Sequence, residues 1–268
     1  MMKTLASVAV LIALAVPAFA DDKETLTQAV SKAAALSSYA FKGETEVQSP
    51  FGGGPPQVPT MDGKYQKDAG LHIKSDKGEI FKKGERVFVK QGSADWQDLA
   101  QVQPPAPAEG EKPNRNRARG ALFGRAMLKN FKAPHEELQD LAKGFKEVKK
   151  AEKTDKIGDI ECTAFSGDLS EEAMKGSPLG RMLGQFGAAG NAETKGSARV
   201  WVDASGNVAI FEVVTKISID IQGNQVDITM TRRCELSDAG KAKVEIPEAV
   251  QKLLNEKPKT EEKKAEDK

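Results

Sequence analysis

The chain has 268 residues, of which 39% are hydrophobic and 6% aromatic, and its formal net charge is +1. A chain of this length and apolar content can bury a sizeable core. Nucleic-acid-binding domains usually carry a clear excess of basic residues, so this charge balance argues against a nucleic-acid partner.

The first twenty residues have the pattern of a secretory signal peptide. Lys3 supplies a positive charge, and residues 5–16 form an apolar run. Ala18 and Ala20 are small residues at the positions that a signal peptidase recognises. The run is too short for a stable transmembrane helix, and no later segment is long and apolar enough to span a membrane. We therefore expect residues 1–20 to be cleaved near Ala20, which leaves a soluble, exported protein that is periplasmic or secreted.

The exported part of the chain begins with one helix and one strand. Residues 22–38 read as a helix, in which Asp22 is the expected N-cap and Leu26 and Val30 lie in an apolar stripe. The next segment alternates apolar and charged residues, which is typical of a strand with one buried face. That face is expected to carry Tyr39, Phe41, Gly43, Thr45 and Val47.

A meander of short strands is predicted over residues 60–99, because turns that contain Gly and Asp recur there at short intervals. Trp96 and Leu99 are expected to close one edge of the core. Residues 100–120 interrupt the pattern as a Pro- and Arg-rich insertion. This insertion could contact a polyanion or an anionic lipid, or it could be a solvated loop.

Two short amphipathic segments flanked by glycine-rich chain resemble each other. Their apolar sides carry Phe123, Met127 and Leu128 in the first segment and Met182, Leu183 and Phe186 in the second. Glycine permits hinging and methionine adapts to varied apolar partners, so these segments could be mobile lids over the sheet. They could also be fixed core helices. Between them, a helix is predicted from Pro134 to Gly144, because proline suits the first helical position.

The longest strands come last and form a hairpin. Residues 208–222 and 226–236 alternate in polarity on either side of a turn, which predicts one buried face and one solvated face. The apolar face is a candidate ligand-binding wall. Its candidate residues are Phe211, Val213, Ile217, Ile228, Met230 and Arg232, the last of which interrupts the apolar series.

Earlier strands are predicted at residues 145–153, 160–164 and 198–203. Cys162 and Cys234 both occupy apolar positions of their strands, so they are expected to form a disulfide in an oxidising compartment. The alternative is two small buried thiols in neighbouring strands. No histidine lies at zinc-ligand spacing from either cysteine, which argues against a metal site.

No catalytic constellation is recognisable in the sequence. There is no Gly-rich phosphate loop before a helix and no nucleophile elbow. His135 is expected at the surface in the first turn of its helix, and His72 is expected to face solvent from its strand. We therefore expect a non-enzymatic protein with no catalytic residue, no metal and no cofactor.

The order of elements and several short motifs resemble one known family. The motifs are Tyr39-x-Phe41-x-Gly43, Val87-Phe88-Val89-Lys90 leading to Trp96, Val200-Trp201-Val202-Asp203 before a Gly-Asn turn, and Ile246-Pro247-Glu248. Over about residues 22–254, this layout is similar to the exported lipoprotein-carrier superfamily, which comprises periplasmic lipoprotein carriers and related half-barrel lipoproteins. The resemblance implies a half-open β-barrel closed by helices, with a hydrophobic cavity for acyl chains or another apolar ligand.

Three features depart from the pattern of that family. Its periplasmic carrier commonly uses an arginine in the cavity; Arg232 is the best candidate here, although it could also reach solvent at the edge of its strand. No cysteine follows the apolar leader, which argues against a lipid-anchored form. The insertion at residues 100–120 has no counterpart that we can name.

We therefore expect a single α+β domain over residues 21–254, followed by a disordered charged tail at 255–268. Its sheet is expected to be antiparallel and curved, with roughly ten strands covered by short helices. The expected function is to bind or carry a lipid or acyl chain between sheet and helical lid, with an envelope protein as a candidate partner. The alternatives are a structural or interaction protein of the envelope with a self-filled core, and a hydrolase whose site the sequence does not reveal.

Overall fold

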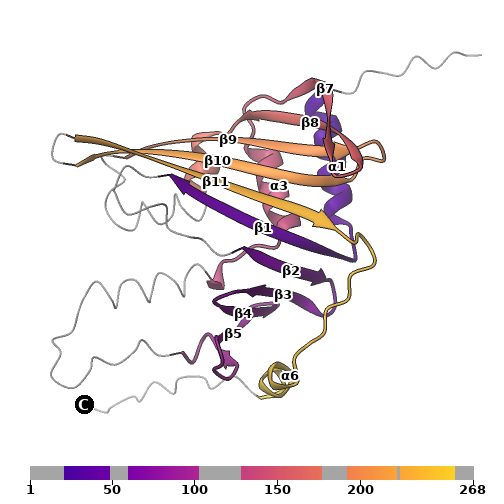
Figure 1. Cartoon of the computed structure of the whole chain (residues 1–268), viewed down its shortest axis with the longest axis vertical. Helices are drawn as coiled ribbons and strands as arrows, with labels where there is room; N and C mark the ends of the chain where they lie inside the picture. The colour runs from indigo at the N-terminus through magenta and orange to yellow at the C-terminus, as the bar shows by residue number, and fades with distance from the viewer. Residues whose placement is uncertain (1–20, 49–59, 103–127, 177–191, 222–223, 257–268) are drawn as a thin grey trace, which may run out of the picture.

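The computed structural model describes residues 21–48, 60–102, 128–176, 192–221 and 224–256. Eleven antiparallel strands form one open, curved sheet, and short helices pack against it (Figure 1). The strand order is β6-β5-β4-β3-β2-β1-β11-β10-β9-β8-β7. The expected α+β class is confirmed, with eleven strands where roughly ten were predicted.

The elements follow the chain mostly as hairpins. The strands are β1 (Ser38–Gln48), β2 (Met61–Gln66), β3 (Gly70–Ser75), β4 (Gly78–Lys83), β5 (Arg86–Gln91), β6 (Gln97–Asp98), β7 (Lys149–Ile157), β8 (Ile160–Asp168), β9 (Ala192–Asp203), β10 (Val208–Ile221) and β11 (Asn224–Ser237). The helices are α1 (Asp22–Ala34), α3 (Pro134–Gly144), α4 (Glu171–Gly176) and α6 (Glu248–Asn255). The predicted bounds of α3 are confirmed, whereas α1 ends before residue 38 because Ser38 already belongs to β1. The predicted N-cap is also wrong, since Asp21 precedes α1 and the Asp22 carboxylate accepts the backbone N–H of Lys150 at 2.9 Å.

The pairing of β1 with β11 joins two meanders. One contains β1 to β6 and the other β7 to β11, and the ladder between them runs from Ala40 opposite Ser237 to Gln48 opposite Thr229. Within the first meander, Gly84 lies in a tight turn with a φ of 57°, a conformation that residues with a Cβ rarely adopt. Within the described ranges, the β1–β11 ladder is the one strand pairing that joins the two meanders.

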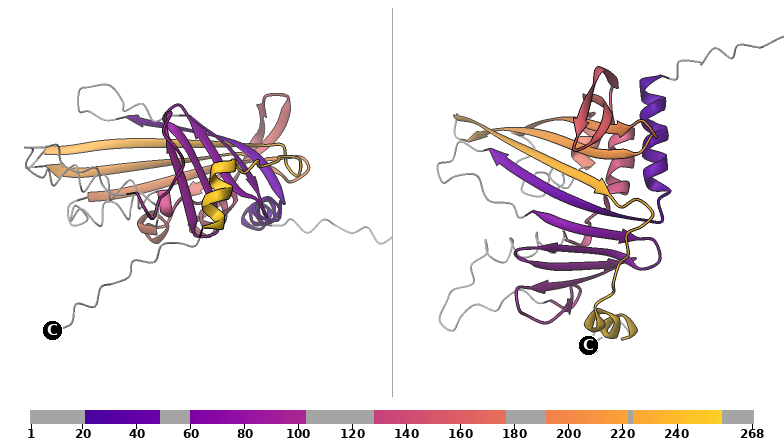
Figure 2. Two further views of the ribbon diagram at one scale, coloured as in Figure 1. Left: turned by 90° about the horizontal axis from the view of Figure 1, so that it is seen from below. Right: turned by 45° about the vertical axis from the view of Figure 1, so that its right-hand side comes forward.

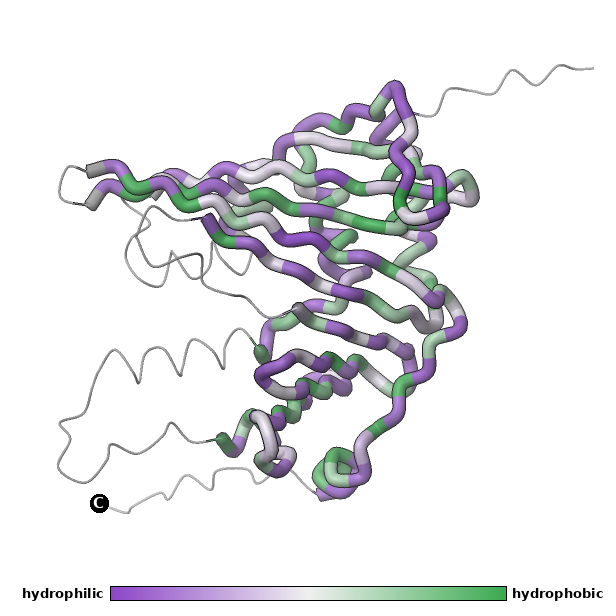
Figure 3. Tube along the Cα trace, viewed as in Figure 1, coloured by the Kyte–Doolittle hydropathy of each residue, from purple (hydrophilic) through white to green (hydrophobic). Residues whose placement is uncertain are grey.

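We call the sheet face that α1 and α3 cover the inner face. One cross-strand row on this face contains Cys234, Phe211, Val200 and Phe165. The two helices lie side by side over it (Figure 2), and side chains such as Leu138 of α3 complete the largest hydrophobic cluster. The alternation of hydrophobic and hydrophilic residues that produces this face is visible along β10 and β11 in Figure 3.

The opposite, outer face is also buried in two places. At one end of the sheet, α6 packs through Val250 against Phe81 and Phe88. Toward the other end, the outer residues of β8, β9 and β10 form a second cluster. This cluster contains Cys162, Ala164, Trp201 and Ile210. The sheet therefore has apolar positions on both faces, as in sheets that are covered on both sides.

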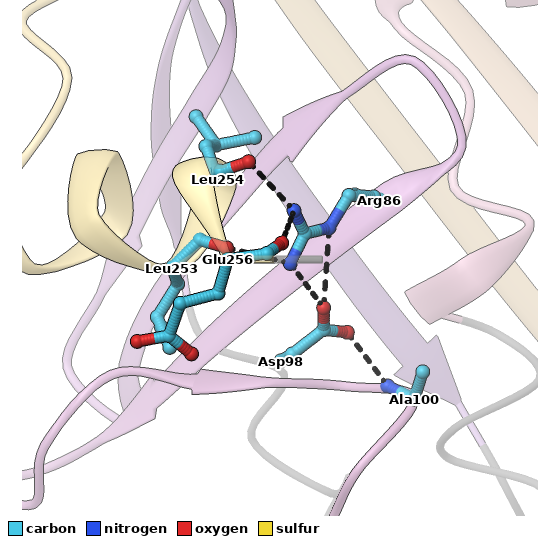
Figure 4. Close-up of polar contacts among 6 residues, drawn as sticks. All are labelled: Arg86, Asp98, Ala100, Leu253, Leu254 and Glu256. Carbon is cyan, nitrogen blue, oxygen red and sulfur yellow. Dashed lines mark hydrogen bonds and ion pairs between the residues drawn. The ribbon is translucent and has the colours of Figure 1, made fainter. Parts of the chain in front are cut away.

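The guanidinium of Arg86 fastens α6 to the sheet (Figure 4). Its Nε and Nη2 atoms donate to Asp98 Oδ2 at 3.2 and 2.8 Å. Its Nη1 and Nη2 atoms also donate to the carbonyl oxygens of Leu253, Leu254 and Glu256 at 2.8, 3.0 and 3.3 Å. Carbonyls of the last helical turn lack partners within the helix. Arg86 therefore caps α6, and its charge suits the negative end of the helix dipole.

The predicted disulfide is wrong, because Cys162 and Cys234 are both free. Cys234 lies opposite Phe211 on the inner face, whereas Cys162 belongs to the outer cluster with Trp201. Two strands, β9 and β10, also separate their strands in the sheet. Both cysteines do occupy buried strand positions, but burial does not show a shared face when both faces are covered.

We expect reduction to leave the melting temperature unchanged, because no disulfide constrains the chain. The side chains of Cys162 and Cys234 are 0% and 1% exposed, and burial raises the pKa of both thiols. The folded protein should therefore resist iodoacetamide, and denaturant without reductant should allow both cysteines to be alkylated. Mass spectrometry counts the adducts. A chain that takes up label only after reduction would contradict the structure.

Arg86→Met should lower the free energy of unfolding by about 2–4 kcal/mol, since it leaves the Asp98 carboxylate, which is 5% exposed, without its cation. Urea unfolding followed by circular dichroism measures the change. Arg233→Met is the matched control, because Arg233 is exposed on β11, and we expect it to change stability by less than about 0.5 kcal/mol. Equal losses in both variants would rule out a special role of Arg86 in holding α6.

Candidate functional site

The candidate site continues the inner face beyond the core that α1 and α3 cover. We call it the distal inner face. It consists of the inward residues Val213, Thr215, Ile217 and Ile219 of β10 and Val226, Ile228, Met230 and Arg232 of β11. Ile217 lies directly opposite Ile228, and Val213 lies opposite Arg232. Thr215 and Ile217 are buried, while the other members are half-buried.

The residues proposed from the sequence lie in different surroundings. Phe211 is fully buried in the inner core, beside Cys234. Leu128 packs against Val87 and Val89 on the inner face of β5, so the structure does not bring it to β10. Only the residues from Val213 to Arg232 gather on the distal inner face. Outside the described residues lie Phe123, Met127, Met182, Leu183, Phe186 and the insertion at 103–120.

An ion pair joins the distal inner face to α3. The Nη1 atom of Arg232 donates to Oε1 of Glu137 at 2.6 Å, and the two side chains are 22% and 19% exposed. Register places Arg232 on the inner face, because it shares a cross-strand row with Thr45 and Val213. Leu138, the residue after Glu137 on α3, is buried in the core and thereby fixes the helix against the sheet. Arg232 therefore turns toward α3. The alternative that the sequence left open was that Arg232 reaches solvent at the edge of its strand.

Glu137 has an unused hydrogen-bonding atom. Its Oε2 is the one buried side-chain oxygen or nitrogen without a hydrogen-bond partner in the part of the chain that the structure describes. Burial raises the pKa of this carboxyl group, and the charge of Arg232 acts in the opposite direction. An unsatisfied buried acceptor costs about 1–3 kcal/mol. The site thus places a free acceptor beside an apolar wall.

His135, in the first turn of α3, is bound to the sheet through Tyr39. The Tyr39 Oη atom lies 2.7 Å from His135 Nδ1 and accepts the backbone N–H of His135 at 3.3 Å. A hydroxyl that accepts one hydrogen bond can still donate its own proton, so Tyr39 can donate to Nδ1 whenever the imidazole is neutral and Nδ1 carries no proton. Tyr65 packs against the same ring, with centroids 4.6 Å apart. His135 thus lies in the first turn of α3 as expected, but it is half-buried against the sheet, because sequence periodicity does not show which strand meets the start of a helix.

His72 does not face solvent either. Its Nε2 atom lies 2.9 Å from Oε2 of Glu79, and its ring contacts those of Phe81 and Trp96. These partners belong to the outer face near α6 and not to the distal inner face. Burial lowers the pKa of His72 more strongly than its carboxylate neighbour raises it. Both histidines are thus built into the fold, and only His135 lies next to the candidate site.

The distal inner face carries mostly aliphatic side chains. Across the described ranges, no three side chains of His, Cys, Asp or Glu are grouped so that they could hold a metal ion. No helix within those ranges combines the length and the apolar content that a membrane crossing requires. The distal inner face instead offers aliphatic area that ends at one ion pair. Apolar walls with a few placed polar groups are typical of sites for small apolar molecules.

We expect acidification to destabilise the protein partly through His135. Burial lowers its pKa in the folded state, so the unfolded chain takes up the proton first and stability falls as the pH drops below about 6.5. His135→Asn keeps an acceptor near the position of Nδ1 but does not titrate. Its free energy of unfolding should therefore depend less on pH between about 7.5 and 5.5 than that of the wild type. An unchanged pH slope in urea unfolding would contradict this role.

Comparisons with known proteins found similar chains among solved structures only. No family model matches the chain, and no curated protein matches it. The chain is similar to LprF from Mycobacterium bovis, at 14% identity and a TM-score of 0.42, over 84% of this chain and 95% of that one. It is also similar to a LolA superfamily protein from Nitrosomonas europaea (9% identity, TM-score 0.30, 86% and 97% covered) and to a DUF1329 family protein from Desulfovibrio piger (6%, 0.28, 85% and 94%). These likenesses concern the fold alone.

Proposed function

We propose that this protein binds an apolar ligand, a lipid or an acyl chain, on the distal inner face and carries it within the cell envelope. The observation that supports this most directly is the composition of that face. Ile217, Ile219, Val226, Ile228 and Met230 all point inward, yet they belong to none of the hydrophobic clusters that the described residues form. Aliphatic area of this kind is stabilised by contact with another apolar surface.

The dimensions and energetics fit an acyl chain. Ile219 is six positions along β10 from Val213, and a strand rises about 3.3 Å per residue, so the apolar stretch is roughly 20 Å long. Each methylene group that leaves water contributes about 0.8 kcal/mol. An extended chain lying along β10 and β11 can therefore bind without directional bonds. The ion pair between Arg232 and Glu137 then marks the end where a polar head group would lie.

The remaining features of the proposal follow the sequence. A leader at residues 1–20 would direct the protein to the envelope, where lipids must cross an aqueous space and an envelope protein would receive or supply the ligand. The apolar segments around Met127 and Met182 would serve as lids for the bound chain. Binding and transfer of this kind require no catalytic group, so the proposed protein is not an enzyme.

A structural role in the envelope is the second candidate, and the inner core favours it. Phe211, Val200 and Phe165 are fully buried together with side chains of α1 and α3, so this half of the inner face is filled by the protein itself. A protein whose distal face is filled in the same way would bind no ligand. Ligand binding by the purified protein separates the two candidates.

Ile228→Asp should weaken binding of the hydrophobic dye N-phenylnaphthylamine at least tenfold, because it places a charge in the middle of the apolar wall. Fluorescence titration measures the dissociation constant. Thr229→Asp is the matched control, since it introduces the same carboxylate one residue away on the outer face of β11. It should bind the dye like the wild type. A wild type that binds no dye would favour the structural role, and equal weakening in both variants would remove the distal inner face as the site.

A further inference from the structure

We infer that the free Oε2 atom of Glu137 is the acceptor for a neutral hydrogen-bond donor on the ligand, a hydroxyl or an amide N–H at the head of an acyl chain. The inference rests on the proposed function and specifies its ligand class. It predicts that the protein selects neutral amphiphiles with a donor over free fatty acids with the same chain.

The position of the ion pair defines where the head group would lie. Arg232 is two residues from Met230 and four from Ile228 along β11, and the side chains of all three point inward. An apolar chain that lies along Ile228 and Met230 therefore ends at Arg232 and its partner Glu137. Beyond this point the inner face is closed by the core, because Cys234, the next inward residue of β11, is only 1% exposed.

The geometry of the ion pair leaves Oε2 of Glu137 without a hydrogen-bond donor. Arginine and a carboxylate often form two parallel hydrogen bonds, but here Arg232 contacts Glu137 through a single bond, from Nη1 to Oε1. Lys132, whose charge also acts on Glu137, is itself paired with Asp140. The Oε2 atom thus remains buried without a donor. A ligand that brings a donor to this atom removes the cost of an unsatisfied acceptor, about 1–3 kcal/mol.

A fatty acid fits this arrangement less well than a neutral amphiphile. Its carboxylate brings a second negative charge to a poorly solvated region, where like charges repel strongly. If the carboxylate of the fatty acid formed an ion pair with Arg232, Glu137 would remain as a buried charge without a partner, which is strongly destabilising. A hydroxyl or amide donates to Oε2 and leaves the ion pair intact. Head-group charge therefore decides between ligands with the same chain.

The test compares four ligands that share the oleoyl chain: monooleoylglycerol, oleamide, methyl oleate and oleate. Each displaces N-phenylnaphthylamine from the full-length protein at concentrations below its micelle threshold. Monooleoylglycerol and oleamide carry donors, whereas methyl oleate is neutral without one. We expect monooleoylglycerol and oleamide to compete at least tenfold more strongly than methyl oleate and oleate. Equal competition by all four, or preference for oleate, would overturn the inference.

Glu137→Gln provides the second arm of the experiment. The amide oxygen can still accept from Arg232, but the amide nitrogen then replaces the free acceptor with a donor. The advantage of monooleoylglycerol over oleate should fall at least tenfold. Glu136→Gln is the matched control, because Glu136 is exposed one residue away on α3 and its carboxylate accepts only the backbone N–H of Ala133 among the described residues. A preference that survives in Glu137→Gln would overturn the inference.

The two proposals fail in different ways. If the wild type does not bind the dye at all, the proposed function fails. If it binds the dye but does not discriminate between the four ligands, apolar binding stands and the assignment of Glu137 falls. Because the ligand series uses the wild-type protein, the inference stays falsifiable even if Glu137→Gln does not fold.

Discussion

The antiparallel pairing of β1 with β11 is the interaction on which the rest of the structure depends. Among the strands that the structure describes, it is the one ladder between the two meanders, and it makes their inner faces continuous. Through this ladder, Tyr39 of β1 and Arg232 of β11 lie on one surface, where α3 contacts both through His135 and Glu137. Long-range pairing of this kind carries the largest loop-closure cost in the fold, since it joins strands almost 200 residues apart.

The sheet uses its two faces for different purposes. On the inner face, α1 and α3 fill one half, and the aliphatic row from Ile217 to Met230 extends beyond them. On the outer face, α6 covers Phe81 and Phe88 and is held at its C-terminal end by Arg86. In the proposed function, the elements that stabilise the fold and the face that binds the ligand are therefore separate. The core would stay closed while the distal inner face exchanges a ligand.

The polar groups near the proposed site are few and specifically placed. Burial lowers the pKa of His135, and the hydrogen bond between its ring and Tyr39 ties the start of α3 to the sheet. One turn of the same helix presents Glu137 to Arg232 and leaves one oxygen without a donor. Buried polar groups are normally satisfied. Oε2 of Glu137 is an exception beside an apolar wall, and the proposed ligand would supply its missing hydrogen bond.

The sequence by itself determined the local elements of this protein and the parity of its strands. Proline at the first position predicted α3 with its observed bounds, and alternation placed Tyr39 and Phe41 on the face that the core covers, because these signals depend only on neighbours in the chain. Tertiary structure decided which buried positions share a face. Alternation is the same for either side of a sheet, so it did not separate Cys162 from Cys234, and the expected disulfide does not form. Tertiary structure also decided the partners of His135 and Glu137. Tyr39 and Arg232 lie about 95 residues away in sequence, and the β1–β11 ladder brings them to α3.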